Sequence, residues 1–117
     1  MNMNIEPSSF AETWAQRKES ARHTLRDVST EELRALVHEL FPDGTHPFAE
    51  AMSNFIEEHR GERALRGETS DRISFIYYPQ SDKGMWYQYT GTLPSVGVLG
   101  PIGLKTLKEI AAEKGHA

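Results

Sequence analysis

Apolar residues recur with the period of an α-helix along the first 60 residues, and they predict three helices. The first follows Ser9 and Glu12, which match a capping box, and the second follows a stronger capping box at Ser29–Glu32. The third begins just before Pro47, a residue suited to a first helical turn. The stripes that define the three buried faces are Phe10, Trp14, Ala21, Leu25 and Val28; Leu33, Leu36, Val37 and Leu40; and Phe48, Met52, Phe55 and Ile56.

The pattern changes to that of β-structure near residue 72. Residues 60–72 are polar and predict a connector, and two runs rich in β-branched and aromatic residues follow, Ile73–Tyr78 and Met85–Thr90. Pro, Asp and Gly between these runs favour a turn and therefore a hairpin. Val96–Leu99 fits either a short third strand or an extended loop. The last helix, predicted over about residues 102–114, places Leu104, Leu107, Ile110 and Ala111 on one face.

These elements predict an α+β fold: three N-terminal helices, an antiparallel β-hairpin that a short third strand can extend, and a C-terminal helix. The length of 117 residues fits a single domain over residues 1–117. We expect residues 1–8 to form a flexible segment ahead of the first helix.

The pairing register of the hairpin decides which side chains share a face. With Tyr78 opposite Met85, both faces mix apolar and polar residues, whereas Tyr77 opposite Met85 collects apolar residues on one face. We favour the second register because it separates a core face, packed under the helices, from a half-polar face. The core face then carries Ile73, Phe75, Tyr77, Met85, Tyr87 and Tyr89, and the half-polar face carries Ser74, Ile76, Tyr78, Trp86, Gln88 and Thr90.

The favoured register brings Ile76, Tyr78 and Trp86 together, with Gln88 at their edge. All four tyrosines lie between residues 77 and 89, and Tyr and Trp are enriched at interfaces. Three roles stay open for this aromatic group: core under the protein's own helices, a surface for a protein partner or a second copy, or the wall of a small-ligand pocket.

Composition narrows the functional classes. The absence of cysteine excludes disulfides, a thiolate nucleophile, iron–sulfur clusters and thiolate zinc sites. The mean hydropathy is -0.58, no apolar run is long enough to span a membrane, and the N-terminus lacks a secretory signal pattern. We therefore expect a cytoplasmic protein without a membrane partner.

Charge is divided unevenly along the chain, whose net charge is -4. Residues 1–71 hold 14 acidic and 8 basic residues, a net -6, whereas residues 72–117 hold 3 acidic and 5 basic residues, a net +2. The overall balance argues against binding nucleic acid by bulk charge, although it leaves a local site on the hairpin open.

No catalytic or metal-binding motif is complete. The histidines do not follow the H-E-x-x-H spacing, and the segment around Ser95 lacks the first glycine of a G-x-S-x-G elbow. His38, Asp43 and His46 lie around one turn, where they can converge. We nevertheless expect no metal and no cofactor, because a metal site needs a ligand set whose spacing this chain does not show.

The glycines that precede the last helix permit a weaker prediction. The segment is not a P-loop, because Leu104 stands where that motif requires a glycine before the lysine. Glycines that lead into a helix N-terminus, followed by a lysine, can still hold an anion. The residues of this possible anion site are Gly100, Gly103 and Lys105.

We therefore predict a small non-enzymatic interaction module whose aromatic hairpin surface binds a protein partner or a second copy. The alternative is a small-ligand or anion-binding domain with a pocket between the hairpin and the C-terminal helix. A small enzyme is the third hypothesis, and the sequence offers no assembled active site for it.

Overall fold

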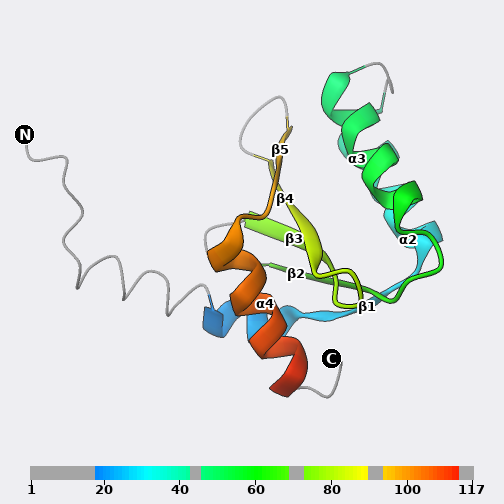
Figure 1. The fold of residues 1–117 in the computed structure, drawn as a ribbon. Coiled ribbons are helices and arrows are strands. Elements are labelled where there is room, and N and C mark those ends of the chain that lie inside the picture. The colour runs from blue at the N-terminus through cyan, green and yellow to red at the C-terminus, as the bar shows by residue number, and fades with distance from the viewer. Residues whose placement is uncertain (1–17, 43–45, 69–72, 90–93, 114–117) are drawn as a thin grey trace, which may run out of the picture.

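A computed structural model describes residues 18–42, 46–68, 73–89 and 94–113, and within these ranges it has an α+β architecture of four helices and a five-stranded sheet (Figure 1). The segment predicted to be flexible, residues 1–8, lies outside the described residues. The elements are a helix over residues 18–24, β1 (Arg26–Val28), α2 (Thr30–Leu40), α3 (Pro47–Glu58), β2 (Ala64–Glu68), β3 (Ile73–Tyr78), β4 (Lys83–Tyr89), β5 (Pro94–Val98) and α4 (Pro101–Glu113).

The strands form an antiparallel sheet in chain order, β1-β2-β3-β4-β5. The predicted hairpin forms its centre, and the third strand that the sequence allowed is present as β5. β1 and β2 were not predicted. β2 lies inside the predicted connector, and its Ala64 and Leu65 are buried although the segment is polar overall.

Local sequence signals set the helix starts. Ser29 caps α2, accepting a hydrogen bond from the backbone N–H of Glu32, whose side chain accepts one from the Ser29 N–H. His46 caps α3 through Nδ1, which accepts from the N–H of Phe48, and Pro47 occupies the first turn. The predicted positions of these two helices are confirmed.

The first helix differs from its prediction. Phe10 and Trp14 lie outside the described residues, and Ala21 and Leu25 are buried as expected. Val28 belongs to β1 and not to the helical stripe. Val28 lies three residues after Leu25, which is a helical spacing. From residue 26 onward, however, the backbone pairs with β2 as a strand.

The favoured hairpin register is wrong. Ile76, not Tyr77, lies opposite Met85, and Phe75 lies opposite Trp86. Because side chains alternate along a strand, Tyr78 and Ile76 share a face with Met85, whereas Trp86 lies on the other face with Phe75. We favoured that register because it separated a core face from a half-polar face, whereas helices cover both faces of this sheet (Figure 1).

The first sheet face packs against α2 and α3. Ile76 and Tyr78 are 0% and 2% exposed there. Arg34 of α2 holds Glu57 of α3 through two hydrogen bonds of 2.8 and 2.9 Å, which fixes the two helices together. The core cluster on this face comprises Leu33, Leu36, Val37, Phe41, Ala49, Met52, Ile56, Ala64, Ile76, Tyr78, Met85 and Tyr87.

The second sheet face packs against α4 and the helix of residues 18–24. Tyr77 is fully buried there, and its hydroxyl donates to Asp82 Oδ1 at 2.7 Å, at the turn that joins β3 to β4. α4 contributes three of its four predicted apolar positions as buried residues, and Leu104 packs on them partly exposed. The core cluster on this face comprises Ala21, Leu25, Leu65, Tyr77, Leu107, Ile110 and Ala111.

Tyr78 provides a pH test of the first face. Its ring stacks on His59 with centroids 4.6 Å apart, and burial, with nearby Glu62 and Glu57, raises its pKa to about 12. The unfolded chain titrates near pH 10, so the stability from this group is complete below about pH 10 and is lost as the pH rises toward 12. We expect Tyr78→Phe to reduce the alkaline loss of unfolding free energy by on the order of 1–2 kcal/mol, measured by urea denaturation.

At pH 7 the ionisation of Tyr78 should contribute no difference between the unfolding free energies of the wild type and Tyr78→Phe. The hydroxyl of Tyr78 is protonated there in both the folded and the unfolded state. Identical alkaline profiles for the wild type and Tyr78→Phe would contradict the burial of Tyr78 beneath α2 and α3.

Candidate functional site

A cavity lies on the second sheet face, between the strands, α4 and the start of the first described helix. Its volume is about 230 Å³. Most of its wall is apolar, and the side chains come from four separate parts of the chain. The lining residues are Lys18, Ala21, Ile73, Phe75, Trp86, Gln88, Leu99, Gly103, Thr106 and Leu107.

The hairpin register builds one wall of this cavity. Phe75 pairs with Trp86 across β3 and β4, and Ile73 pairs with Gln88, so all four side chains lie on one face. Gly97 of β5 lies opposite Trp86, and a Cβ atom at Gly97 would stand 2.6 Å from the indole ring. The absence of a side chain at Gly97 therefore allows Trp86 to lie against β5.

Two helices build the opposite wall, with residues spaced by three or four positions. Gly103, Thr106 and Leu107 share one face of α4, and Lys18 and Ala21 share one face of the helix of residues 18–24. Thr24 attaches that helix to β2, because its Oγ1 donates to the carbonyl of Glu68 at 2.8 Å and accepts from the Glu68 N–H.

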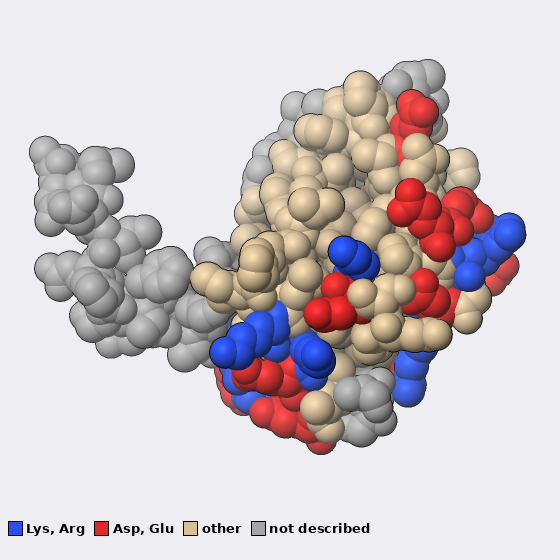
Figure 2. Space-filling view, viewed as in Figure 1, with Lys and Arg blue, Asp and Glu red and all other residues tan. Residues whose placement is uncertain are grey.

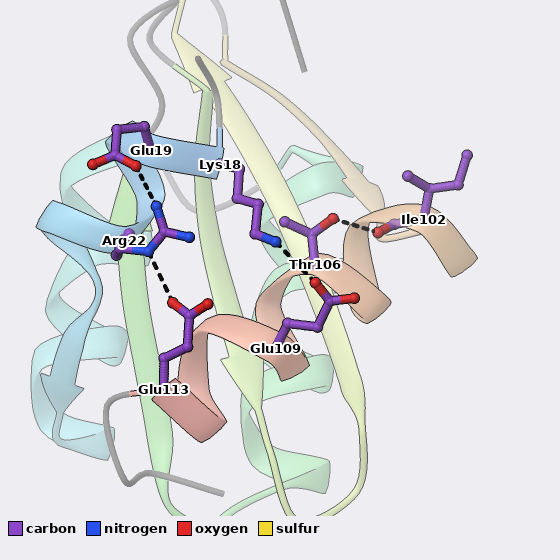
Figure 3. Close-up of polar contacts among 7 residues, drawn as sticks. All are labelled: Lys18, Glu19, Arg22, Ile102, Thr106, Glu109 and Glu113. Atoms are coloured by element: carbon purple, nitrogen blue, oxygen red, sulfur yellow. Dashed lines mark hydrogen bonds and ion pairs between the residues drawn. The ribbon is translucent and has the colours of Figure 1, made fainter. Parts of the chain in front are cut away.

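A ladder of two ion pairs joins the helix of residues 18–24 to α4 beside the cavity (Figure 3). Lys18 Nζ lies 2.9 Å from Glu109 Oε2, and Arg22 Nε lies 2.8 Å from Glu113 Oε2. Lys18 and Arg22 are four residues apart, as are Glu109 and Glu113, so the two pairs lie one helical turn apart on both helices. Hydrogen bonds from Lys18 and Arg22 hold the pKa of Glu109 and Glu113, respectively, below the usual range.

Two polar groups of the cavity wall have no partner among the residues that the structure describes. Thr106 donates to the carbonyl of Ile102 at 2.9 Å, and Lys18 is engaged by its ion pair (Figure 3). By contrast, the Gln88 amide and the Trp86 indole N–H make no side-chain hydrogen bond to any described residue. Both side chains are partly exposed, so water or a ligand can satisfy them.

The structure divides the predicted aromatic surface between two faces. Ile76 and Tyr78 are buried against α2 and α3, whereas Trp86 and Gln88 line the cavity under α4. The four residues therefore do not meet. The physical reason is the register, which places Trp86 opposite Phe75 and so on the face away from Tyr78.

The possible anion site is also spread out. Gly103 lines the cavity beside Leu99. Gly100 precedes α4, and a Cβ atom built on it would have no other atom within 4 Å. Lys105 is exposed, and its charge acts on Glu109, one helical turn further along α4. Pro101 begins α4 and has no N–H to offer an anion. Anion binding here stays a prediction.

The histidine group considered for a metal is only partly described, since Asp43 lies outside the described residues. His46 uses its ring nitrogen to cap α3 and stacks on Phe41 with centroids 5.5 Å apart. Across the described ranges, no three His, Cys, Asp or Glu residues gather closely enough to hold a metal ion. No helix in those ranges is long and apolar enough to cross a membrane.

Sequence reasoning placed a possible pocket beside the C-terminal helix but did not name Thr106 or Lys18 as residues of it. Gly103 lies three and four positions before Thr106 and Leu107, which puts the three residues on one side of α4, and this was the available signal. Lys18 lies three positions before Ala21 on the predicted apolar stripe, where the aliphatic part of a lysine can cover apolar surface while its charge stays in water.

A second hollow between α2 and α3 is more polar, and its wall includes His38, Glu50 and Ser53. Its most prominent charges, Arg34 and Glu57, already satisfy each other. The polar wall of this hollow suits an apolar ring less well than the cavity beneath α4.

Comparison with known protein families, with characterised proteins and with solved structures found no match to this chain. Its function must therefore be inferred from its own geometry.

The contact between Gly97 and Trp86 can be tested with a matched pair of substitutions. Gly97→Ala places a methyl group against the indole, which should destabilise the fold by about 1–3 kcal/mol and change Trp86 fluorescence. Gly100→Ala adds the same methyl group where no atom lies within 4 Å, so it should leave both unchanged. Chemical denaturation and fluorescence in a Trp14→Phe background measure both effects. Equal behaviour of the two variants would refute the packing of Trp86 on β5.

Proposed function

We propose that this protein binds a small neutral molecule with a planar ring in the cavity between the β3–β4 hairpin and α4. The observation that carries the proposal is the largely apolar cavity of about 230 Å³ lined by Trp86 and Gln88, whose side-chain polar groups bond to no described residue. The proposal develops the alternative hypothesis of a small-ligand pocket between the hairpin and the C-terminal helix.

The size of the cavity limits the ligand. Ligand pockets usually start near 300 Å³, and an apolar cavity of about 150 Å³ already admits benzene. A volume of about 230 Å³ therefore suits one or two fused rings and not a nucleotide or a peptide.

The chemistry of the wall favours a neutral ligand. Phe75 and Trp86 offer aromatic surfaces, which attract a planar ring by stacking or edge contact. Lys18 is paired with Glu109, so the cation at the rim is already neutralised. The Gln88 amide can donate to and accept from one polar group on the ligand.

Indole and benzamide are suitable probes, because each carries a ring of the right size and one of the two has an amide. We expect both to raise the melting temperature and to alter Trp86 fluorescence in a Trp14→Phe background. Thr106→Phe should fill the cavity and reduce probe affinity at least tenfold while the protein stays folded. Gln88→Leu should weaken benzamide more than indole.

Ala112→Phe is the matched control, because it puts the same side chain on an exposed position of α4 outside the cavity. It should leave probe binding unchanged. The proposal fails if neither probe affects the wild type at millimolar concentration, or if Thr106→Phe and Ala112→Phe bind the probes equally well.

The earlier expectation of an aromatic partner surface is not part of this proposal, because Ile76 and Tyr78 are 0% and 2% exposed. A cytoplasmic location and the lack of a nucleic-acid partner stay predictions. Association with a second copy is supported by a different part of the sheet.

A further inference from the structure

The two edges of the sheet differ in their charge. β1 forms one edge, and it carries Arg26 and Asp27, of which Asp27 is held by Arg63 at 2.6 Å. β5 forms the other edge and contains no charged residue. Charged side chains on an edge strand are a common protection against pairing with another chain. β1 has this protection, and β5 lacks it.

The lack of charge extends well beyond β5. No Asp, Glu, Lys or Arg lies between Lys83 and Lys105, in a chain that is 26% charged. Figure 2 shows an area without charged side chains over β5 and the beginning of α4, whereas charges gather along the lower and right-hand rims of this view. Of the three large apolar residues that are exposed in the described ranges, two lie here, Val98 at 77% and Ile102 at 59%.

The hydrogen-bonding pattern shows which backbone groups of β5 are free. The N–H of Leu99 donates to the carbonyl of Gly84 at 2.9 Å. In an antiparallel pair, hydrogen-bonded residues alternate with residues whose N–H and C=O point away. Gly97 and Ser95 therefore face β4, whereas Val96 and Val98 direct their backbone groups outward, away from the sheet. Pro94 has no N–H and limits the free edge to these two residues.

We propose that β5 is a dimerisation edge, on which β5 of a second copy pairs in the antiparallel direction around a two-fold axis at Gly97. This arrangement places Val96 of each copy opposite Val98 of the other. Each such pair exchanges two backbone hydrogen bonds, because the N–H and C=O of both residues point outward. The two sheets then continue as one.

A second copy suits this edge for chemical reasons. An isologous interface brings each surface against itself, so a charged residue near the axis would meet its own like charge. β5 has no such residue, and Gly97 has no side chain to obstruct the close approach at the axis. The exposed Val98 gains a β-branched neighbour, Val96, on the same face.

The paired segment is short, so the dimer should be weak and in rapid exchange. Interfaces below roughly 1,200 Å² are typical of transient association. We expect the full chain to pass from mainly monomer to mainly dimer between about 10 and about 500 µM. Sedimentation equilibrium measures this transition directly.

Substitutions at Val98 test the surface. Val98→Lys puts a charge beside the axis and should keep the chain monomeric over the whole range. Val98→Thr retains a branched, uncharged side chain and should still dimerise. Ala112→Lys adds the same charge at an exposed position in the last turn of α4, at the end of that helix away from β5 (Figure 1), and should not change the mass. Melting curves verify that each variant is folded.

Hydrogen exchange gives a second readout that does not depend on a variant. The amide protons of Val96 and Val98 should exchange rapidly at low concentration and more slowly at high concentration, whereas that of Gly97 should change little. A monomer at every concentration would overturn the proposal. So would a dimer that Val98→Lys leaves intact, because it would use another surface. Neither result bears on the cavity, which indole binding tests separately.

Discussion

An antiparallel sheet that is apolar on both faces must be covered on both faces, and this constraint organises the described part of the protein. β3 and β4 place Ile76 and Met85 on one face, and Phe75 and Trp86 on the other. The α2–α3 pair covers the first, while α4 and the helix of residues 18–24 cover the second. The cavity lies on the second face, where α4 and the helix of residues 18–24 leave space above the strands.

Much of the local structure could be predicted because its signals are local. The capping box at Ser29 and the proline at the start of α3 each act within one helical turn, and they mark helices correctly. The turn between β3 and β4 likewise follows from its own residues, including Asp82, whose φ is 52°. The presence of the hairpin needed no knowledge of the rest of the chain.

The register could not be obtained in this way. A preference for one polar face is valid only when one face meets water, and β3, with the sequence Ile-Ser-Phe-Ile-Tyr-Tyr, is apolar on both faces. Which sheet face a helix covers depends on tertiary contacts between residues that are distant in sequence. β2 was missed for a related reason: its Leu65 is fully buried by residues distant in sequence, although Arg66 and Glu68, which follow it, indicate a surface segment.

The cavity and the exposed edge of β5 share two features of the chain, Gly97 and the absence of charged residues around it. Gly97 lets Trp86 lie against β5 on one side, and the same residue keeps the outer edge of β5 open on the other. Both features lie between Lys83 and Lys105, where the chain has no charged residue. The second half of the sheet is therefore the part of this protein best suited to apolar contacts, whether with a small ring or with another copy.

The face on which Trp86 lies is the central claim, because the cavity and its proposed ligand both depend on it. Nuclear Overhauser contacts of the Trp86 indole protons, in isotopically labelled full-length protein, measure that face most directly. The structure predicts contacts to the α-protons of Gly97 and to the ring of Phe75. Contacts to Tyr78 or Ile76 instead would put Trp86 beneath α2 and α3 and contradict the account.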